Sequence, residues 1–332
     1  MEFQSSRPKI SVVMSFYKEP LQWISSAVCS ILDQSFQDFE FIIICDNPEN
    51  AEGIAYIREE AEKDCRIRLI ENKFNIGITK SLNRGLEISR GEYIARMDAD
   101  DIAFAERFEM QASFLDSHED ISVCATNVHS INAKGRIIRR NKYSRKLDSD
   151  HLFISSSIAH PSVMFRRELL EVRKPLYNED YPYSQDYELW QHLFLKGYKI
   201  HTLPKTLMLY RKSMNQISAS SRIQQDTLFR AAHRDFIFNW LEIKGITTKE
   251  DRHDLRMALM KADKAFKTFD RKDRKRLSKI IYTLYYSIGT TQTGYRLKYF
   301  WDSNLIILRV RFILSLRLLL SKKSRRYRLS ID

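Results

Sequence analysis

The sequence contains little glycine, proline or cysteine. Among its 332 residues are 9 glycines and 7 prolines, and no low-complexity run or internal repeat is present. This composition excludes collagen-like, disordered and solenoid proteins. The four cysteines form no CxxC pair, so we expect buried, reduced thiols and no disulfide scaffold. No apolar segment follows the N-terminus as in a signal peptide, and we therefore expect a cytoplasmic protein.

A clean apolar run long enough to cross a membrane is also lacking. The best candidate, residues 304–320, is interrupted by Arg309, Arg311 and Arg317. One interpretation is a helix that lies on the inner face of the cell membrane, followed by the basic cluster at residues 322–326. The alternative is a helix packed on the rest of the chain or on a second subunit, as in a homo-oligomer.

The formal charge of +13 comes mainly from lysines and arginines near the C-terminus. A basic excess favours contact with a polyanion, either nucleic acid or an anionic membrane surface. We find no RNP or zinc-finger pattern, so nucleic acid is not the expected partner. A non-catalytic polyanion-binding protein stays open as an alternative.

Apolar runs rich in β-branched residues alternate with helical patterns in the first part of the chain. Strands are predicted at residues 10–14, 39–45, 67–70 and 92–97, and helices at 20–32, 52–63 and 79–89, with Thr79 as N-cap. This alternation indicates βαβ units and a parallel sheet. Strand signals vanish near Ser221, which predicts a domain at residues 1–220 and a basic helical region at 221–332.

The pattern loosens between these two parts. We predict a helix at residues 104–117, strands at 122–125 and 162–165, and a helix at 183–195 that ends before Gly197. Residues 132–135 are expected to form a turn between two extended segments.

Carboxylates follow two of the predicted strands. Asp46 ends the second strand, and Asp98, Asp100 and Asp101 end the fourth. Ligands of open α/β sheets bind beyond the carboxyl ends of the strands. Carboxylates this close repel one another unless a cation compensates, and Mg²⁺ or Mn²⁺ prefers such oxygen ligands. The alternative is an acidic turn that caps the helix beginning near Phe104.

The stretch at residues 91–101, GEYIARMDADD, with Glu106 and Arg107 after it, resembles the core motif of the inverting family 2 glycosyltransferases of the GT-A fold. Five further blocks follow that family's order: residues 10–19, 40–50, 75–86, 160–166 and 184–190. The resemblance covers residues 9–220. It implies an α/β fold with a Rossmann-like, mostly parallel sheet flanked by helices and a C-terminal helical extension.

The resemblance also implies an activity: inverting transfer of a hexose or N-acetylhexosamine from a nucleotide diphosphate sugar, expected to be UDP-linked. The acceptor would be a hydroxyl of a glycan or glycolipid, such as lipopolysaccharide. Asp100 would ligate Mn²⁺ or Mg²⁺, and Asp186 would be the general base. The residues implied in donor binding are Tyr17, Glu19, Asp46, Asn75, Arg84, Asp98, Ala99, Asp101 and Arg211.

Structural interpretations compete with several of these roles. Tyr17 suits a core aromatic, Asp46 an Asx turn, and Asp186 the negatively charged first turn of a helix. A sugar nucleotidyltransferase would also use Mg²⁺ and carboxylates. It should, however, carry a glycine-rich phosphate loop after the first strand, and residues 15–20 contain no glycine.

Overall fold

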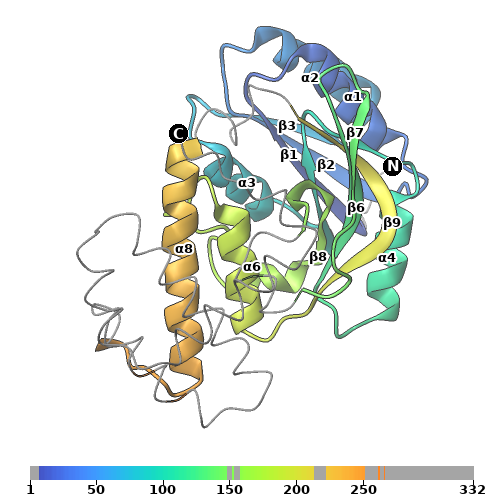
Figure 1. The fold of residues 1–332 in the computed structure, drawn as a ribbon. Coiled ribbons are helices and arrows are strands. Elements are labelled where there is room, and N and C mark those ends of the chain that lie inside the picture. The colour runs from blue at the N-terminus through green and yellow to red at the C-terminus, as the bar shows by residue number, and fades with distance from the viewer. Residues whose placement is uncertain are drawn as a thin grey trace. The chain divides into compact units, whose positions relative to one another are not determined.

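The chain forms an α/β unit around one sheet, followed by a second unit. The computed structural model describes residues 7–147, 152, 158–212, 222–250, 261 and 265. Its two compact units are Met1–Ala232 and His233–Asp332. The sheet of the first unit has the strand order β3-β2-β1-β4-β8-β6-β9-β5, and β7 pairs with β6 (Figure 1).

Four parallel strands form one half of this sheet. The elements are β1 (Ile10–Phe16), α1 (Leu21–Leu32), β2 (Phe39–Cys45), α2 (Ala51–Lys63), β3 (Ile67–Glu71), α3 (Ile78–Glu87) and β4 (Tyr93–Asp98). Every residue of β1 and β2 is buried, as expected of parallel strands covered on both faces. The carboxyl ends of β1, β2 and β4 lie next to one another because β1 pairs with both neighbours in register.

The other half of the sheet is mixed. Its elements are β5 (Ile102–Ala103), α4 (Arg107–Ser117), β6 (Val123–Ile131), β7 (Ile137–Asn141), η1 (His160–Ser162), β8 (Met164–Arg166), η2 (Arg167–Glu171), α6 (Gln185–Leu195) and β9 (Ile200–Arg211). Strand β8 runs antiparallel between β4 and β6, whereas β9 runs parallel to β6. The predicted α/β class with a helix-flanked sheet is confirmed, and antiparallel pairs add to the expected parallel half.

Several local predictions were wrong. Gly77, with φ +85°, precedes α3 as its N-cap, and Thr79 lies inside the helix. Helix α4 begins at Arg107 and not at residue 104. The strand predicted at residues 162–165 begins only at Met164, as β8, because residues 160–162 form a 3-10 helix. Strand β9 was not predicted at all, because Pro204 interrupts its pattern where the register with β6 shifts.

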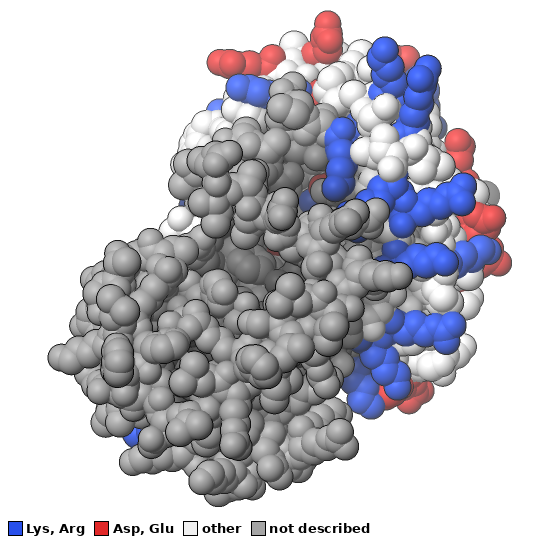
Figure 2. Space-filling model, viewed as in Figure 1, with Lys and Arg blue, Asp and Glu red and all other residues white. Residues whose placement is uncertain are grey.

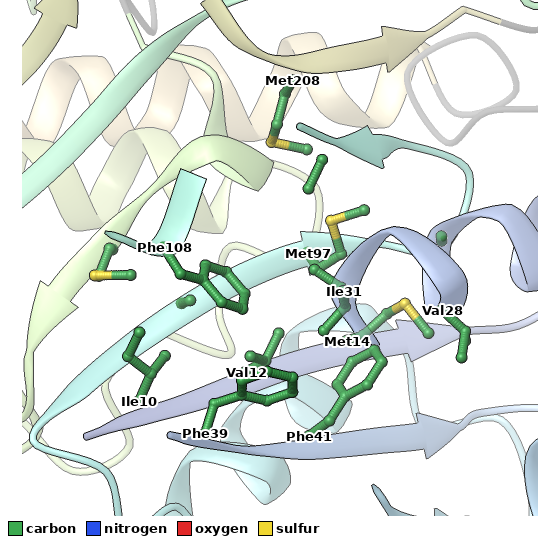
Figure 3. Close-up of a cluster of buried hydrophobic side chains, with 14 of the residues drawn as sticks. Ile10, Val12, Met14, Val28, Ile31, Phe39, Phe41, Met97, Phe108 and Met208 are labelled. Atoms are coloured by element: carbon green, nitrogen blue, oxygen red, sulfur yellow. The ribbon is translucent and has the colours of Figure 1, made fainter. Parts of the chain in front are cut away.

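The main hydrophobic core lies between the sheet and helices α1, α2 and α4 (Figure 3). Val12, Met14 and Phe41 point from the strands toward Ile31 of α1, and Phe108 of α4 meets Phe39 edge to face at 5.6 Å. Helix α3 covers the opposite face. This face of β4 also carries Arg96 and Asp98, because successive side chains of a strand alternate between faces.

Gly91 permits the close approach of the loop before β4 to β1. A Cβ atom there would lie 2.7 Å from both the Ile10 carbonyl carbon and the Tyr93 oxygen, which are backbone atoms that cannot swing aside. The Gly91 N–H also donates to Ser11 Oγ at 2.7 Å. The amino end of β4 is therefore anchored by a contact that only glycine allows.

We expect Gly91→Ala to lower the free energy of unfolding by at least about 2 kcal/mol, because the overpacked backbone must shift. Denaturant unfolding measures the loss. Gly135→Ala is the control, since a Cβ atom there meets nothing within 4 Å and only the left-handed φ of +78° is strained, at about 1–2 kcal/mol. A Gly91→Ala variant as stable as the wild type would contradict this packing.

Helix α8 (Arg222–Ile243) contains the boundary between the two units. In the second unit Phe236, Ile237, Trp240 and Leu241 are buried, and burial lowers the pKa of His233 to about 4. None of the helices in the described ranges has an apolar stretch long enough to cross a membrane. The apolar segment at residues 304–320 and the basic cluster at 322–326 lie outside the described residues, and the predicted boundary at residues 220–221 stays a prediction.

Candidate active site

Three carboxylates converge at the carboxyl end of β4. Asp98, Asp100 and Asp101 each offer an oxygen, and these oxygens lie within 4.8 Å of one another. Asp101 is fully buried, and Asp100 is 9% exposed. The alternative of a helix cap does not hold, because the N-cap of α4 is Glu106 and makes no side-chain cap hydrogen bond.

The chemistry of this acidic trio fits a divalent cation. Burial, followed by the charges of Asp100 and Asp98, raises the pKa of Asp101 well above its usual range. Asp101 Oδ1 accepts the backbone N–H of Arg211 at 2.7 Å, whereas the buried Oδ2 has no hydrogen-bond partner among the described residues. A hard cation would compensate the repulsion and use such an oxygen.

Arg96 forms an ion pair with one member of the trio, its Nη2 lying 2.5 Å from Asp98 Oδ1. Its side chain is 3% exposed, on the face of β4 that carries Asp98. The pair occupies one of the two Asp98 carboxylate oxygens. Arg107 supports the strand from behind, since its Nη2 donates to the Arg96 carbonyl at 2.7 Å and to the Val163 carbonyl at 3.3 Å.

Arg211, at the end of β9, braces the acidic turn. Its Nε donates to the Asp100 carbonyl at 2.7 Å, and its Nη1 donates to the carbonyls of Asn132 and Ala133 at 3.3 and 3.2 Å. The guanidinium also lies over the Trp23 ring, 5.0 Å from its centroid. Arg211 therefore lies beside the acidic trio, and its role in donor binding stays a prediction.

Asp46 fixes the loop that carries Asn75 and is linked through Asn72 to Arg84, two other residues predicted to bind the donor. Its Oδ1 accepts Asn72 Nδ2 at 2.8 Å and the Ile76 N–H at 2.9 Å, while Oδ2 accepts the Gly77 N–H at 2.9 Å. Arg84 Nη1 donates to Asn72 Oδ1, so Asn72 links Asp46 to Arg84. Asn75, which is exposed, lies in the loop that Asp46 fixes, and its Oδ1 accepts the Gly77 N–H.

Tyr17 and Glu19 follow β1, the strand next to β4. Glu19 Oε2 accepts the Tyr17 N–H at 2.6 Å, and the Tyr17 carbonyl accepts Asn47 Nδ2 and Asn50 Nδ2. Burial, with a contribution from the charge of Asp98, raises the pKa of Glu19. Tyr17 is partly exposed and not a core aromatic.

Ala99 differs from the other residues implied in donor binding. Its side chain packs in the main hydrophobic core and is 2% exposed. Any contact with a donor would therefore use its backbone.

Asp186 is the second residue of α6, where the positive end of the helix dipole favours a negative charge. Burial raises the pKa of its carboxyl, the charge of Asp98 adds to the rise, and Arg96 opposes it. The loop before α6 contacts α3, since Thr79 Oγ1 donates to the Pro182 carbonyl at 3.2 Å, and α3 covers the face of the sheet that carries Asp98. His160 donates to or accepts from the Tyr177 hydroxyl at 2.8 Å, and Trp190 is fully buried beside His160, so Trp190 has a packing role.

Sequence reasoning missed two residues of this site. Arg96 had a readable signal, because it is the one charged side chain within the apolar run at residues 93–97. For Asn72 the only signal in the sequence was its position directly after β3. Its hydrogen bonds to Asp46 and Arg84 form only in the folded chain.

Comparisons with known proteins give a consistent result. The family model for glycosyl transferase family 2 matches residues 11–173. An uncharacterized glycosyltransferase of Methanocaldococcus jannaschii is 35% identical over 229 residues, which cover 68% of this chain and 78% of that protein. The O-antigen biosynthesis glycosyltransferase WbnJ of Escherichia coli is 27% identical over 206 residues, covering 61% and 79%.

A solved structure shares the fold. TarS 1–349 of S. aureus, in complex with UDP-GlcNAc, superposes with a TM-score of 0.58 at 19% identity. The match covers 86% of this chain and 82% of that one.

Proposed function

Because this chain belongs to glycosyl transferase family 2 and is a glycosyltransferase, we propose that it moves a hexose or N-acetylhexosamine from a UDP-sugar to an acceptor hydroxyl with inversion. The observation that carries this proposal is the convergence of Asp98, Asp100 and Asp101 within 4.8 Å at the end of β4, on the same sheet edge as Asp46. The UDP-GlcNAc complex of TarS, which shares the fold, supports the choice of nucleotide.

The donor would lie across the ends of β1, β2 and β4. Tyr17 and Asp46 would line the base pocket, where Asp46 has one free acceptor position on Oδ2 beside its bond to Gly77 among the described residues. Asp98, oriented by Arg96, would accept a ribose hydroxyl. Asn75, in the loop that Asp46 holds, and Arg84, in α3, would close the nucleotide side of the pocket.

Mn²⁺ or Mg²⁺ would be held by Asp100, with Asp101 Oδ2 available as a second oxygen. When bound, the ion would neutralise the negative charge that develops on the diphosphate leaving group. The chain's own part is to present these oxygens in a turn fixed by Arg211. Two protein carboxylates with phosphate oxygens are the usual set for such an ion.

Asp186 would accept the proton of the acceptor hydroxyl as that oxygen attacks the anomeric carbon. Attack from the side opposite the diphosphate inverts the configuration. A carboxylate whose pKa is raised by burial is a better proton acceptor than an ordinary aspartate, provided that it is ionised at the working pH.

The acceptor we propose is a glycan or a lipid-linked glycan. WbnJ, a relative named for O-antigen biosynthesis, supports this choice. The basic region at residues 221–332 would keep the enzyme at the inner face of the membrane or in a homo-oligomer. The family match disfavours both alternatives from the sequence, the nucleotidyltransferase and the non-catalytic polyanion binder.

A screen of nucleotide sugars tests the proposal. Purified enzyme with each donor, with Mn²⁺, Mg²⁺ or a chelator, is assayed for release of nucleoside diphosphate. We expect one UDP-hexose or UDP-N-acetylhexosamine to be hydrolysed or transferred in the presence of metal. Release from no donor under any metal condition, by a protein that unfolds cooperatively, would contradict it.

Arg96 provides a second test, of the geometry of the donor site. We expect Arg96→Met to weaken UDP binding at least about tenfold, because Asp98 loses the charge-assisted bond that orients it. Arg96→Lys should recover part of the affinity, since it restores the charge without the planar fork. Calorimetric titration with UDP and Mn²⁺ measures both variants. Wild-type affinity in folded Arg96→Met would show that this pair does not orient Asp98.

A further inference from the structure

The turn after β6, strand β7 and the residues that follow it carry an unbalanced positive charge. We name this segment, residues 132–147, the basic hairpin. Seven of these residues are Lys or Arg and none is Asp or Glu: Lys134, Arg136, Arg139, Arg140, Lys142, Arg145 and Lys146. All seven are exposed, and within the described part of the chain none forms an ion pair. Figure 2 shows Lys and Arg side chains gathered where Figure 1 draws β6, β7 and β9.

The same hairpin exposes two large apolar residues that are neighbours in the sequence. Ile137 and Ile138, the first residues of β7, are 52% and 55% exposed. Among the described residues they are the only adjacent pair of exposed large hydrophobics, the others being Leu21, Phe74 and Ile243. Strand β7 is an edge strand that pairs with β6 alone in the described sheet. An exposed apolar pair flanked by cations marks an interaction surface.

We propose that the basic hairpin docks on an anionic membrane surface. The isoleucines would enter the boundary between headgroups and acyl chains, while the lysines and arginines contact anionic headgroups. Charge alone would fit a soluble polyanion equally well. The exposed isoleucine pair favours a membrane, because a soluble polyanion offers no apolar phase in which to bury it.

The hairpin is joined directly to the acidic trio. Arg211 donates from Nη1 to the Asn132 and Ala133 carbonyls at the hairpin turn, and from Nε to the Asp100 carbonyl. Docking would therefore hold the acidic trio close to the lipid surface. This inference does not depend on the sugar donor, and it differs from the expectation for residues 304–326, which are another segment of the chain.

Vesicle co-sedimentation of the full-length chain tests the proposal. The vesicles are phosphatidylcholine alone or phosphatidylcholine with phosphatidylglycerol. We expect binding only to the anionic vesicles, and less of it as salt is raised. Arg136→Gln with Arg140→Gln should weaken binding roughly 30-fold, from about 1 kcal/mol per charge. Ile137→Ser with Ile138→Ser should weaken it at least about tenfold.

Each pair has a matched control that leaves the hairpin intact. Arg58→Gln with Lys63→Gln removes two exposed charges from α2, and Ile243→Ser removes an exposed isoleucine elsewhere. Release of UDP from the donor in solution should be unchanged in all of these variants, which separates a docking defect from a failure of the proposed function.

Loss of vesicle binding in both hairpin pairs, with both controls near the wild type, supports the proposal. If only the arginine pair loses binding, the hairpin recognises anionic charge without inserting its isoleucines, and the proposed docking at the boundary between headgroups and acyl chains is overturned. If neither pair loses binding, the membrane contact lies elsewhere and the arginines serve only to protect an edge strand. Equal losses of vesicle binding in the control variants would show a non-specific effect and would also overturn the proposal.

Discussion

Asp186→Asn should lower kcat by about 10²–10⁴-fold, because the acceptor hydroxyl would lose its general base. The substitution keeps the size of the side chain and its place in the first turn of α6. Donor binding should be nearly unchanged, since Asp186 is assigned no contact with the nucleotide. Steady-state kinetics with a UDP-sugar and its acceptor, together with calorimetric binding of UDP, separate the two effects.

A nearby carboxylate provides the control. Asp180 is exposed in the loop before α6, and Asp180→Asn should leave kcat within about twofold of the wild type, as for most surface substitutions. A folded Asp186→Asn enzyme with wild-type kcat would remove Asp186 from the mechanism. An equal loss in both variants would point to a general charge effect.

The pH dependence follows from the burial of Asp186. Burial raises the pKa of this carboxyl above its ordinary value of 3.8. Because a general base acts only when deprotonated, activity should fall as the pH drops through this raised pKa. The acidic limb of kcat should therefore lie above the range of an exposed aspartate, and it should disappear from the residual activity of Asp186→Asn.

Asp100→Asn should lower kcat by about 10²–10³-fold, because the ion that stabilises the leaving diphosphate would lose its principal ligand. The thermal stabilisation produced by UDP with Mn²⁺ should also disappear.

A cooperative unfolding transition of Asp100→Asn in the absence of ligand distinguishes a lost metal site from a misfolded protein. Asp120→Asn is the control, since Asp120 is an exposed carboxylate that pairs with Lys199 and is not a member of the acidic trio. Asp120→Asn should keep both the activity and the rise in melting temperature that UDP with Mn²⁺ produces. If Asp100→Asn retained the full rise in melting temperature with UDP and Mn²⁺, Asp100 would be excluded as the ligand of the ion.

The sequence was sufficient for the parallel half of the sheet. The runs at residues 10–14 and 39–45 are apolar throughout because both faces of β1 and β2 are covered, and the helices between them fix their direction. The rule that ligands bind at strand carboxyl ends then located Asp46 and the acidic trio. That part of the prediction depended only on local pattern and chain order.

The rest of the site depends on tertiary packing. Strand β9 was missed because Pro204 and the register shift opposite Asn127 break its alternation, yet this strand delivers Arg211 to the acidic turn. Asn72 was missed because its partners lie just after β2 and in α3. An arginine within an apolar strand, such as Arg96, needs a buried acidic partner, and this requirement is a signal that can be read from sequence.

Anomalous diffraction of Mn²⁺ in crystals grown with UDP would show directly whether Asp100 holds the ion. We expect a single strong peak about 2.0–2.2 Å from an Asp100 carboxylate oxygen, in contact with the diphosphate. UDP bound across the strand ends with no ion beside Asp100, or with the Arg96 guanidinium in the place of the ion, would contradict it.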